Sequence, residues 1–197
     1  MNLNQACWLG GPARSGKSTI AKDIAKKSGI ISYHVDDYFG NVMMKNIIIN
    51  REKNPNLYIM QNEDENFVTQ LQLKEYIDIV FGVHRELFDF VKNDIINLST
   101  SDKVIIEGLS LLPDILNENG ISNACYLLSS HDFFEEKTIF WDKVKTQDEK
   151  DNISSMMEAM RNHIEEKANF YGFKIIPVNN EHTLEINTKL VSEHFSL

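Results

Sequence analysis

Short apolar runs recur along the chain and are separated by longer stretches with helical periodicity. The runs lack the polar alternation of a half-exposed strand, so each is typical of a strand covered on both faces, as in a parallel sheet. We predict five strands, in QACWLGG (5–11), IISYHV (30–35), KVIIEG (103–108), NACYLLSS (123–130) and FKIIPV (173–178).

The stretches between these runs predict helices. Residues 18–29 place Ile20 and Ile24 on one face and end at a glycine. Apolar residues recur every three or four positions across 73–91 and again across 153–168, and residues 182–195 predict a closing helix. Strands and helices that alternate in this way predict an α/β fold with an open parallel sheet, whose ligands gather at the carboxyl ends of the strands.

Composition limits the class of protein. A chain of 197 residues with 42% hydrophobic and 25% charged residues predicts one domain, residues 1–197. Its net charge of −9 opposes binding to nucleic acid. No apolar stretch approaches the roughly 20 residues of a membrane helix, so we expect no membrane association and a cytoplasmic location. Cys7 and Cys125 lie in apolar runs, which favours buried thiols over redox or metal chemistry.

The strongest chemical signal is the segment from Gly11 to Ser18, GPARSGKS, which fits the pattern G-x-x-x-x-G-K-[ST] between a predicted strand and a predicted helix. Glycines let backbone N–H groups turn toward an anion, Lys17 supplies a compact positive charge, and Ser18 offers a hydroxyl to Mg²⁺. A glycine-rich turn without a ligand is the weaker alternative. We predict ATP and Mg²⁺ as cofactors, held by Gly11, Pro12, Ala13, Arg14, Ser15, Gly16, Lys17, Ser18 and Thr19.

Carboxylates follow two of the predicted strands. Asp36 and Asp37 end the second strand, and adjacent side chains on an extended chain point to opposite faces, so one of them, which we take to be Asp36, faces the γ-phosphate. Asp36 would accept the proton of an acceptor hydroxyl or hold it near Mg²⁺. Glu107 ends the third strand and would orient water on Mg²⁺ or contact the acceptor. The alternatives are a capped turn at the aspartates and a plain strand-end turn at Glu107.

Three segments together resemble the small-molecule kinases of the P-loop superfamily: GGPARSGKSTIA (10–21), HVDDYF (34–39) and VIIEG (104–108). DDYF is most similar to the uridine kinase and nicotinamide riboside kinase branch, in which the first aspartate is the base or hydroxyl ligand, a role that carries over to Asp36. The resemblance implies the P-loop NTPase fold with strand order 2-3-1-4-5. It also implies an acceptor-binding insertion and helix at 41–100 and a lid-like region at 129–172. Within the insertion, the sequence of 41–66 is polar and predicts irregular structure.

The cations fit the family pattern less well. Family lids carry two or more arginines, whereas the one arginine in 129–172 is Arg161; the region also holds lysines, among them Lys137, Lys143 and Lys145. Arg161 is either a catalytic phosphate clamp or a partner in an i,i+4 ion pair on a helix. Arg85 is either a substrate contact for an acidic acceptor or a surface residue. Arg51 is a further candidate contact to the substrate.

The residues therefore predict an ATP-dependent phosphotransferase that moves the γ-phosphate to a hydroxyl of a small nucleoside-like or sugar-like acceptor. An acceptor that presents a hydroxyl to Asp36 is favoured over one that presents a phosphate group, since a phosphate needs a more basic pocket. A nucleoside monophosphate kinase is one alternative. A nucleotide-binding protein with a vestigial kinase site is another. A regulatory GTPase is disfavoured because no Asn-Lys-x-Asp segment is present.

Overall fold

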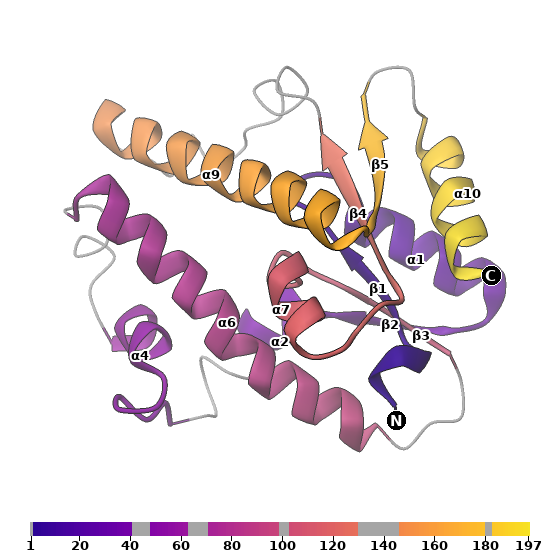
Figure 1. Cartoon of the computed structure of the whole chain (residues 1–197), viewed down its shortest axis with the longest axis horizontal. Helices are drawn as coiled ribbons and strands as arrows, with labels where there is room; N and C mark the ends of the chain where they lie inside the picture. Colours follow the sequence, from indigo (N-terminus) through magenta and orange to yellow (C-terminus); the bar gives the residue numbers. More distant parts are fainter. Residues whose placement is uncertain (1, 41–47, 63–70, 99–102, 130–145, 180–182) are drawn as a thin grey trace.

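The computed structural model describes residues 2–40, 48–62, 71–98, 103–129, 146–179 and 183–197. Five parallel strands form one sheet in the order β2-β3-β1-β4-β5 (Figure 1). They are β1 (Cys7–Gly10), β2 (Ile31–His34), β3 (Val104–Glu107), β4 (Ala124–Ser129) and β5 (Lys174–Val178). Every residue of the three central strands is buried, as the unbroken apolar runs predict. The edge strands β2 and β5 keep exposed residues, so the expectation that each run is covered on both faces is wrong for them. The predicted fold class and strand order are confirmed.

Helices cover both faces of this sheet (Figure 1). One face packs against α1 (Lys17–Ser28) and α10 (Leu184–Phe195), and the other against α6 (Leu73–Asn97), α7 (Pro113–Glu118) and α9 (Gln147–Tyr171). Alternate residues of β1 face the two sides, so Trp8 joins the core under α6 while Cys7 joins the core under α1. Both cysteines are buried and free, as expected.

The end of the second strand differs from the prediction. β2 stops at His34, and the chain turns at once into a short helix, α2 (Val35–Tyr38), which carries Asp36 and Asp37. The expectation that these aspartates lie on an extended chain and point to opposite faces is therefore wrong. Val35 is fully buried, and carboxylates in the first turn of a helix are favoured by its dipole.

The expected irregular stretch at 41–66 contains a helix, α4 (Pro55–Asn62). Glu86 of α6 explains it: one carboxylate oxygen accepts from the backbone N–H and the side-chain amide of Asn56, and the other accepts from the N–H of Leu57. These are first-turn donors that a helix cannot satisfy internally. A carboxylate some thirty residues away in sequence thus caps α4, and Leu57 packs into the core.

The remaining elements agree with the predicted periodicity. The long helices α6 and α9 contain the predicted apolar stretches, and a short 3-10 turn, η1 (Leu3–Gln5), precedes β1.

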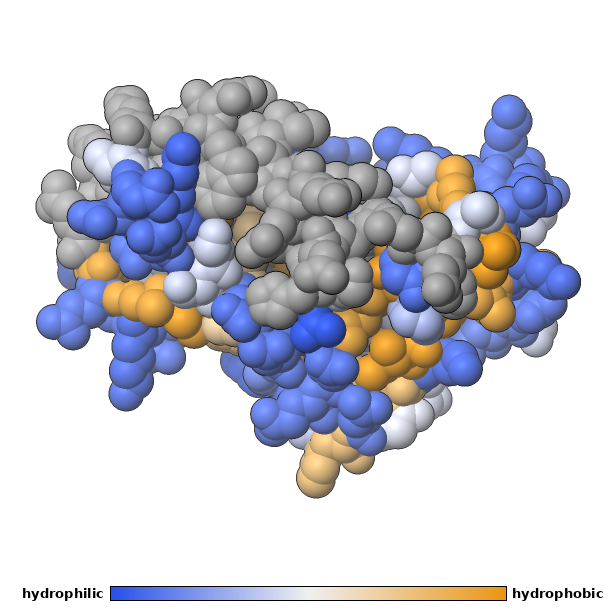
Figure 2. Space-filling model, turned by 90° about the horizontal axis from the view of Figure 1, so that it is seen from above, coloured by the Kyte–Doolittle hydropathy of each residue, from blue (hydrophilic) through white to orange (hydrophobic). Residues whose placement is uncertain are grey.

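On the face seen in Figure 2, the described surface is largely hydrophilic, with hydrophobic side chains in separate groups. Among the described residues, no helix combines the length and the apolar character needed to cross a membrane.

Candidate active site

The segment between β1 and α1 is built around glycines with unusual backbone angles. Gly11 has φ of 141°, and a Cβ there would lie 2.3 Å from the carbonyl oxygen of Leu127. Gly16 has φ of 86° directly before the first turn of α1. Arg14 also adopts a left-handed φ, of 63°, which non-glycine residues rarely do. The sequence motif therefore produces a tight loop that ends at the amino terminus of a 12-residue helix.

Lys17 occupies the base of this loop. Its side chain is buried, and Nζ donates a hydrogen bond of 2.9 Å to the carbonyl oxygen of Pro12. Burial lowers the pKa of Lys17, and the nearby carboxylates of Glu107 and Asp36 oppose that shift. Ser18 and Thr19, the next two residues, are exposed on the first turn of α1.

Glu107 lies at the carboxyl end of β3, next to His34 at the end of β2. Its side chain is 2% exposed, and Oε1 pairs with Nδ1 of His34 at 2.6 Å. The other histidine nitrogen lies 3.2 Å from the hydroxyl of Ser32. Among the described residues, Glu107 Oε2 is buried without a hydrogen-bond partner. His34 is absent from the predicted site residues, because its pairing with Glu107 depends on the register of β2 and β3, which the sequence does not give.

Asp36 completes the group. The side chain of Asp36 is exposed, yet the surrounding protein removes part of the water from its carboxylate and so raises the pKa of Asp36. The positive charge of Lys17 opposes this shift, and the negative charge of Glu107 adds to it. The backbone N–H of Leu109 donates to the carboxylate and stabilises its charged form. The charges of Lys17, Asp36 and Glu107 therefore lie near enough to influence one another. Asp37 is the next residue on α2 and is also exposed.

These oxygens suit a hard divalent cation. Within the described residues, no cluster of three or more His, Cys, Asp or Glu side chains is arranged to hold a metal ion. Mg²⁺ bound with a nucleotide needs only one or two protein oxygens besides the phosphates and waters. The unsatisfied Oε2 of Glu107 is such an oxygen, buried where a bound cation would stabilise it. Of the predicted ligands, Glu107 therefore presents an oxygen that suits Mg²⁺, and the roles of Ser18 and Asp36 stay predictions.

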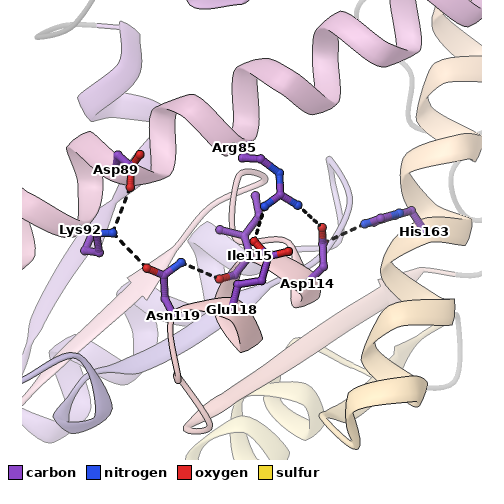
Figure 3. Close-up of polar contacts among 8 residues, drawn as sticks. All are labelled: Arg85, Asp89, Lys92, Asp114, Ile115, Glu118, Asn119 and His163. Carbon is purple, nitrogen blue, oxygen red and sulfur yellow. Dashed lines mark hydrogen bonds and ion pairs between the residues drawn. The ribbon is translucent and has the colours of Figure 1, made fainter. Parts of the chain in front are cut away.

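Arg85 lies in a separate polar network that joins three helices (Figure 3). From α6 it donates to Glu118 and, at 2.7 Å, to Asp114, both on α7. His163 of α9 pairs with the other oxygen of Asp114 at 2.9 Å. The hydrogen bond from His163 and the charge of Arg85 hold the pKa of Asp114 below its usual value, although burial acts in the opposite direction. Arg85 thus ties α6 to α7 in this structure.

The other two predicted arginines also have protein partners. Arg161 donates through Nε to the carbonyl oxygen of Ser129 at 3.0 Å, and forms the i,i+4 ion pair with Glu165, also at 3.0 Å. Arg51 lies over the ring of Tyr58, with 5.6 Å between the guanidinium carbon and the ring centre. Lys137, Lys143 and Lys145 lie outside the described residues, as do parts of the predicted insertion and lid.

A small apolar hollow adjoins the loop. We call it the methionine hollow; it is lined by Pro12, Ala13, Leu109, Met156, Met157 and Met160. The first two belong to the glycine-rich loop, Leu109 follows β3, and the methionines come from α9. Because Leu109 also donates its N–H to Asp36, the hollow and the carboxylate are neighbours.

Comparison with known proteins places this architecture in a class. No protein-family model and no curated protein sequence matches the chain. Shikimate kinase from Bacteroides thetaiotaomicron is similar in structure, with a TM-score of 0.58, 17% identity and 98% of each chain covered. Deoxyadenosine kinase from M. mycoides with bound dATP gives a TM-score of 0.53 at 17% identity, over 98% of this chain and 100% of the other.

Shikimate kinase from Acinetobacter baumannii in complex with shikimate has a TM-score of 0.53 and 12% identity, with 97% of this chain and 93% of the other covered. The five-stranded parallel sheet with helices on both faces is thus the fold of the P-loop small-molecule kinases. At such low identity the likeness defines the fold alone. The finer likeness to the uridine kinase and nicotinamide riboside kinase branch is not confirmed by these structures and stays a prediction.

Proposed function

We propose that this protein is an ATP-dependent phosphotransferase that moves the γ-phosphate of ATP to a hydroxyl of a small molecule. The observation that carries the proposal is the meeting of Lys17, Asp36 and Glu107 at the end of the glycine-rich loop. A loop that binds phosphate, a buried ammonium and two carboxylates are the parts that phosphoryl transfer requires. The kinase fold of the structural neighbours supports the same class of reaction.

In the proposed step, the acceptor hydroxyl oxygen forms a bond to the γ-phosphorus, and the bond from that phosphorus to the β,γ-bridging oxygen breaks. ADP leaves with the bridging oxygen, and the hydroxyl proton passes to the carboxylate of Asp36. Lys17 exchanges its contact with the Pro12 carbonyl for the phosphate oxygens, where it stabilises developing negative charge. Bound Mg²⁺, held by Ser18 and Glu107 with its water shell, would neutralise charge on the β- and γ-phosphates.

The raised pKa of Asp36 supports its role as the proton acceptor. A carboxylate with an ordinary pKa is a weak base at neutral pH, and an upward shift brings it closer to the range of efficient general bases. We assign the role of proton acceptor to Asp36, because Lys17 and Glu107 both act on its carboxylate.

The experiment compares Lys17→Ala with Lys22→Ala. Lys22 is an exposed lysine on the same helix, α1, so it controls for the loss of one positive charge. ATP turnover is measured with Mg²⁺ against hydroxyl-bearing metabolites, and the melting temperature is measured with and without ATP and Mg²⁺. Lys17→Ala should lower turnover at least about 10²-fold and abolish thermal stabilisation by ATP, while Lys22→Ala behaves like the wild type.

Two results would contradict this function. Turnover by Lys17→Ala at the wild-type rate would show that the loop does not take part in catalysis. Thermal stabilisation by ATP that depends on Lys17, without turnover of any acceptor, would instead favour a nucleotide-binding protein whose kinase site is vestigial.

A further inference from the structure

His84 is a polar residue on the apolar face of α6. Every other buried residue of this helix, which is described over its whole length, is apolar. Nδ1 of His84 and the hydroxyl of Ser110 share a hydrogen bond of 2.8 Å, and both side chains are buried. Among the described residues, Nε2 of the same ring is buried without a hydrogen-bond partner. The bond to Ser110 is therefore the contact that explains a polar ring at this place in the core.

Packing alone does not favour this pair. A leucine at position 84 would continue the apolar face, whereas an imidazole with one unsatisfied nitrogen loses hydration that nothing in the described core replaces. Burial lowers the pKa of His84 from 6.5 to about 4, so the ring is uncharged at neutral pH. Residues that conflict with their packing environment in this way concentrate at functional positions.

Ser110 lies next to a backbone group that contacts the candidate site. It belongs to residues 108–112, which lead from β3 to α7. Leu109, the preceding residue, donates its backbone N–H to the carboxylate of Asp36. The bond from His84 to Ser110 therefore holds the chain one residue beyond this donor.

The turn of α6 that carries His84 is itself tied to neighbouring helices. Arg85, the next residue, donates to Asp114 of α7 at 2.7 Å (Figure 3). Glu86 accepts from the backbone N–H of Leu57 in α4 at 2.8 Å. The ring of His84 thus extends from a part of the helix that other elements hold in place, as the support of a functional group requires.

We propose that His84 is a positioning residue for Asp36. Its hydrogen bond to Ser110 holds the segment after β3 so that the backbone N–H of Leu109 reaches the Asp36 carboxylate. The inference rests on the proposed function for the role of Asp36 as the proton acceptor. The contact itself does not depend on turnover, so it is tested separately.

Three substitutions separate the hydrogen bond from the packing around it. Ser110→Ala removes one buried oxygen and leaves the ring in place, and His84→Leu removes the bond but keeps an apolar side chain. His84→Asn keeps a donor and an acceptor near the place of Nδ1, so it restores a bond to Ser110. Val191→Ala is the control, because it removes buried carbon atoms from the core under α1, on the other face of the sheet.

The amide proton resonance of Leu109 reports the contact without turnover, and Asp36→Asn marks where this resonance lies once the carboxylate is lost. In Ser110→Ala and in His84→Leu, the Leu109 resonance should move upfield toward that position, because a hydrogen bond to a charged acceptor is weakened. It should return toward its wild-type position in His84→Asn and should not move in Val191→Ala.

Kinetics then test whether the contact positions a reacting group. In Ser110→Ala and in His84→Leu, kcat should fall at least about tenfold while the KM for ATP stays within about twofold. The double variant should be slower than the slower single variant by no more than about twofold, since both changes remove the same bond. His84→Asn should recover kcat to within about threefold of the wild type, and Val191→Ala should lower the melting temperature with kcat unchanged.

The outcomes separate this proposal from the proposed function. A Leu109 resonance that stays in place in both Ser110→Ala and His84→Leu overturns the proposal and leaves the phosphotransferase intact. A resonance that moves while kcat is unchanged, or a loss of kcat that His84→Asn does not repair, also overturns it. If the wild type phosphorylates no compound and the resonance still moves, the contact is supported and the phosphotransferase function alone is contradicted.

Discussion

Gly108 gives the most direct test of how Asp36 is positioned. It follows Glu107 and carries no side chain where β3 passes α2; a Cβ there would lie 2.6 Å from the Cβ of Val35 and 3.2 Å from its Cγ2. The backbone of Gly108 has no left-handed φ, so Gly108→Ala acts through this contact alone. Val35 directly precedes Asp36 on α2, and Leu109, the donor to Asp36, directly follows Gly108.

The size of the effect follows from the overlap. Carbon atoms pack best at about 3.5–4.0 Å, so the alanine must push Val35 and α2 away by about 1 Å. A displacement of that size at a reacting group costs on the order of 10²-fold in rate. Overpacking of this kind also lowers the free energy of unfolding by about 1–3 kcal/mol.

The assay measures kcat with the acceptor found in the compound panel, and ATP affinity by calorimetry. We expect kcat to fall about 10²-fold while ATP affinity stays within about threefold. The glycine-rich loop lies between β1 and α1, so a displacement of α2 does not move it directly. Gly40→Ala is the control, since a Cβ there meets nothing within 4 Å. A folded Gly108→Ala protein with wild-type kcat would refute the view that contact with Val35 positions Asp36.

Three further predictions concern single groups. Asp36→Asn should lower phosphate transfer by roughly 10²–10⁴-fold with ATP affinity unchanged, whereas Asp37→Asn should lose far less; the reverse order in a kinetic assay would show that Asp37 is the acting carboxylate. His34→Ala should lower the free energy of unfolding in urea by about 1–3 kcal/mol, because it leaves Oε1 of buried Glu107 without its partner; unchanged stability would contradict this. Burial lowers the pKa of His84 from 6.5 to about 4, so the unfolded chain binds a proton there that the folded chain does not. Stability should therefore fall as the pH drops from 6.5 toward 4, by about 1.4 kcal/mol per unit at most, and His84→Gln should reduce that slope in urea titrations.

The fold was predictable because its signals are local in sequence. Five apolar runs, each four to six residues long in the structure, alternate with helical stretches, and that alternation alone defines a parallel α/β sheet. The glycine-rich loop was predictable for the same reason, since Gly11, Gly16 and Lys17 are fixed within one short segment.

The rest depends on contacts between distant parts of the chain. Glu86 caps α4 from about thirty residues away, so the sequence of 55–62 read as irregular. The pairing of His34 with Glu107 appears only once β2 and β3 are in register. The long-range partners of Arg85 and Arg161 likewise lie 29 or more residues away, which is why their candidate roles could not be separated from structural ones by sequence.

The central place of β1 has a consequence for how the chain is made. β1 is synthesised before the other four strands of the sheet, yet its neighbours are β3 and β4, and Cys7 pairs in register with Ile105. At roughly 5–20 residues per second, translation needs on the order of 5–20 s to supply that partner. During that interval the run Cys7–Gly10 has no sheet to join, and the glycine-rich loop has no strand to anchor it. The proposed ATP site can therefore form only late in synthesis, so ATP bound there would stabilise the folded product and would not assist early folding.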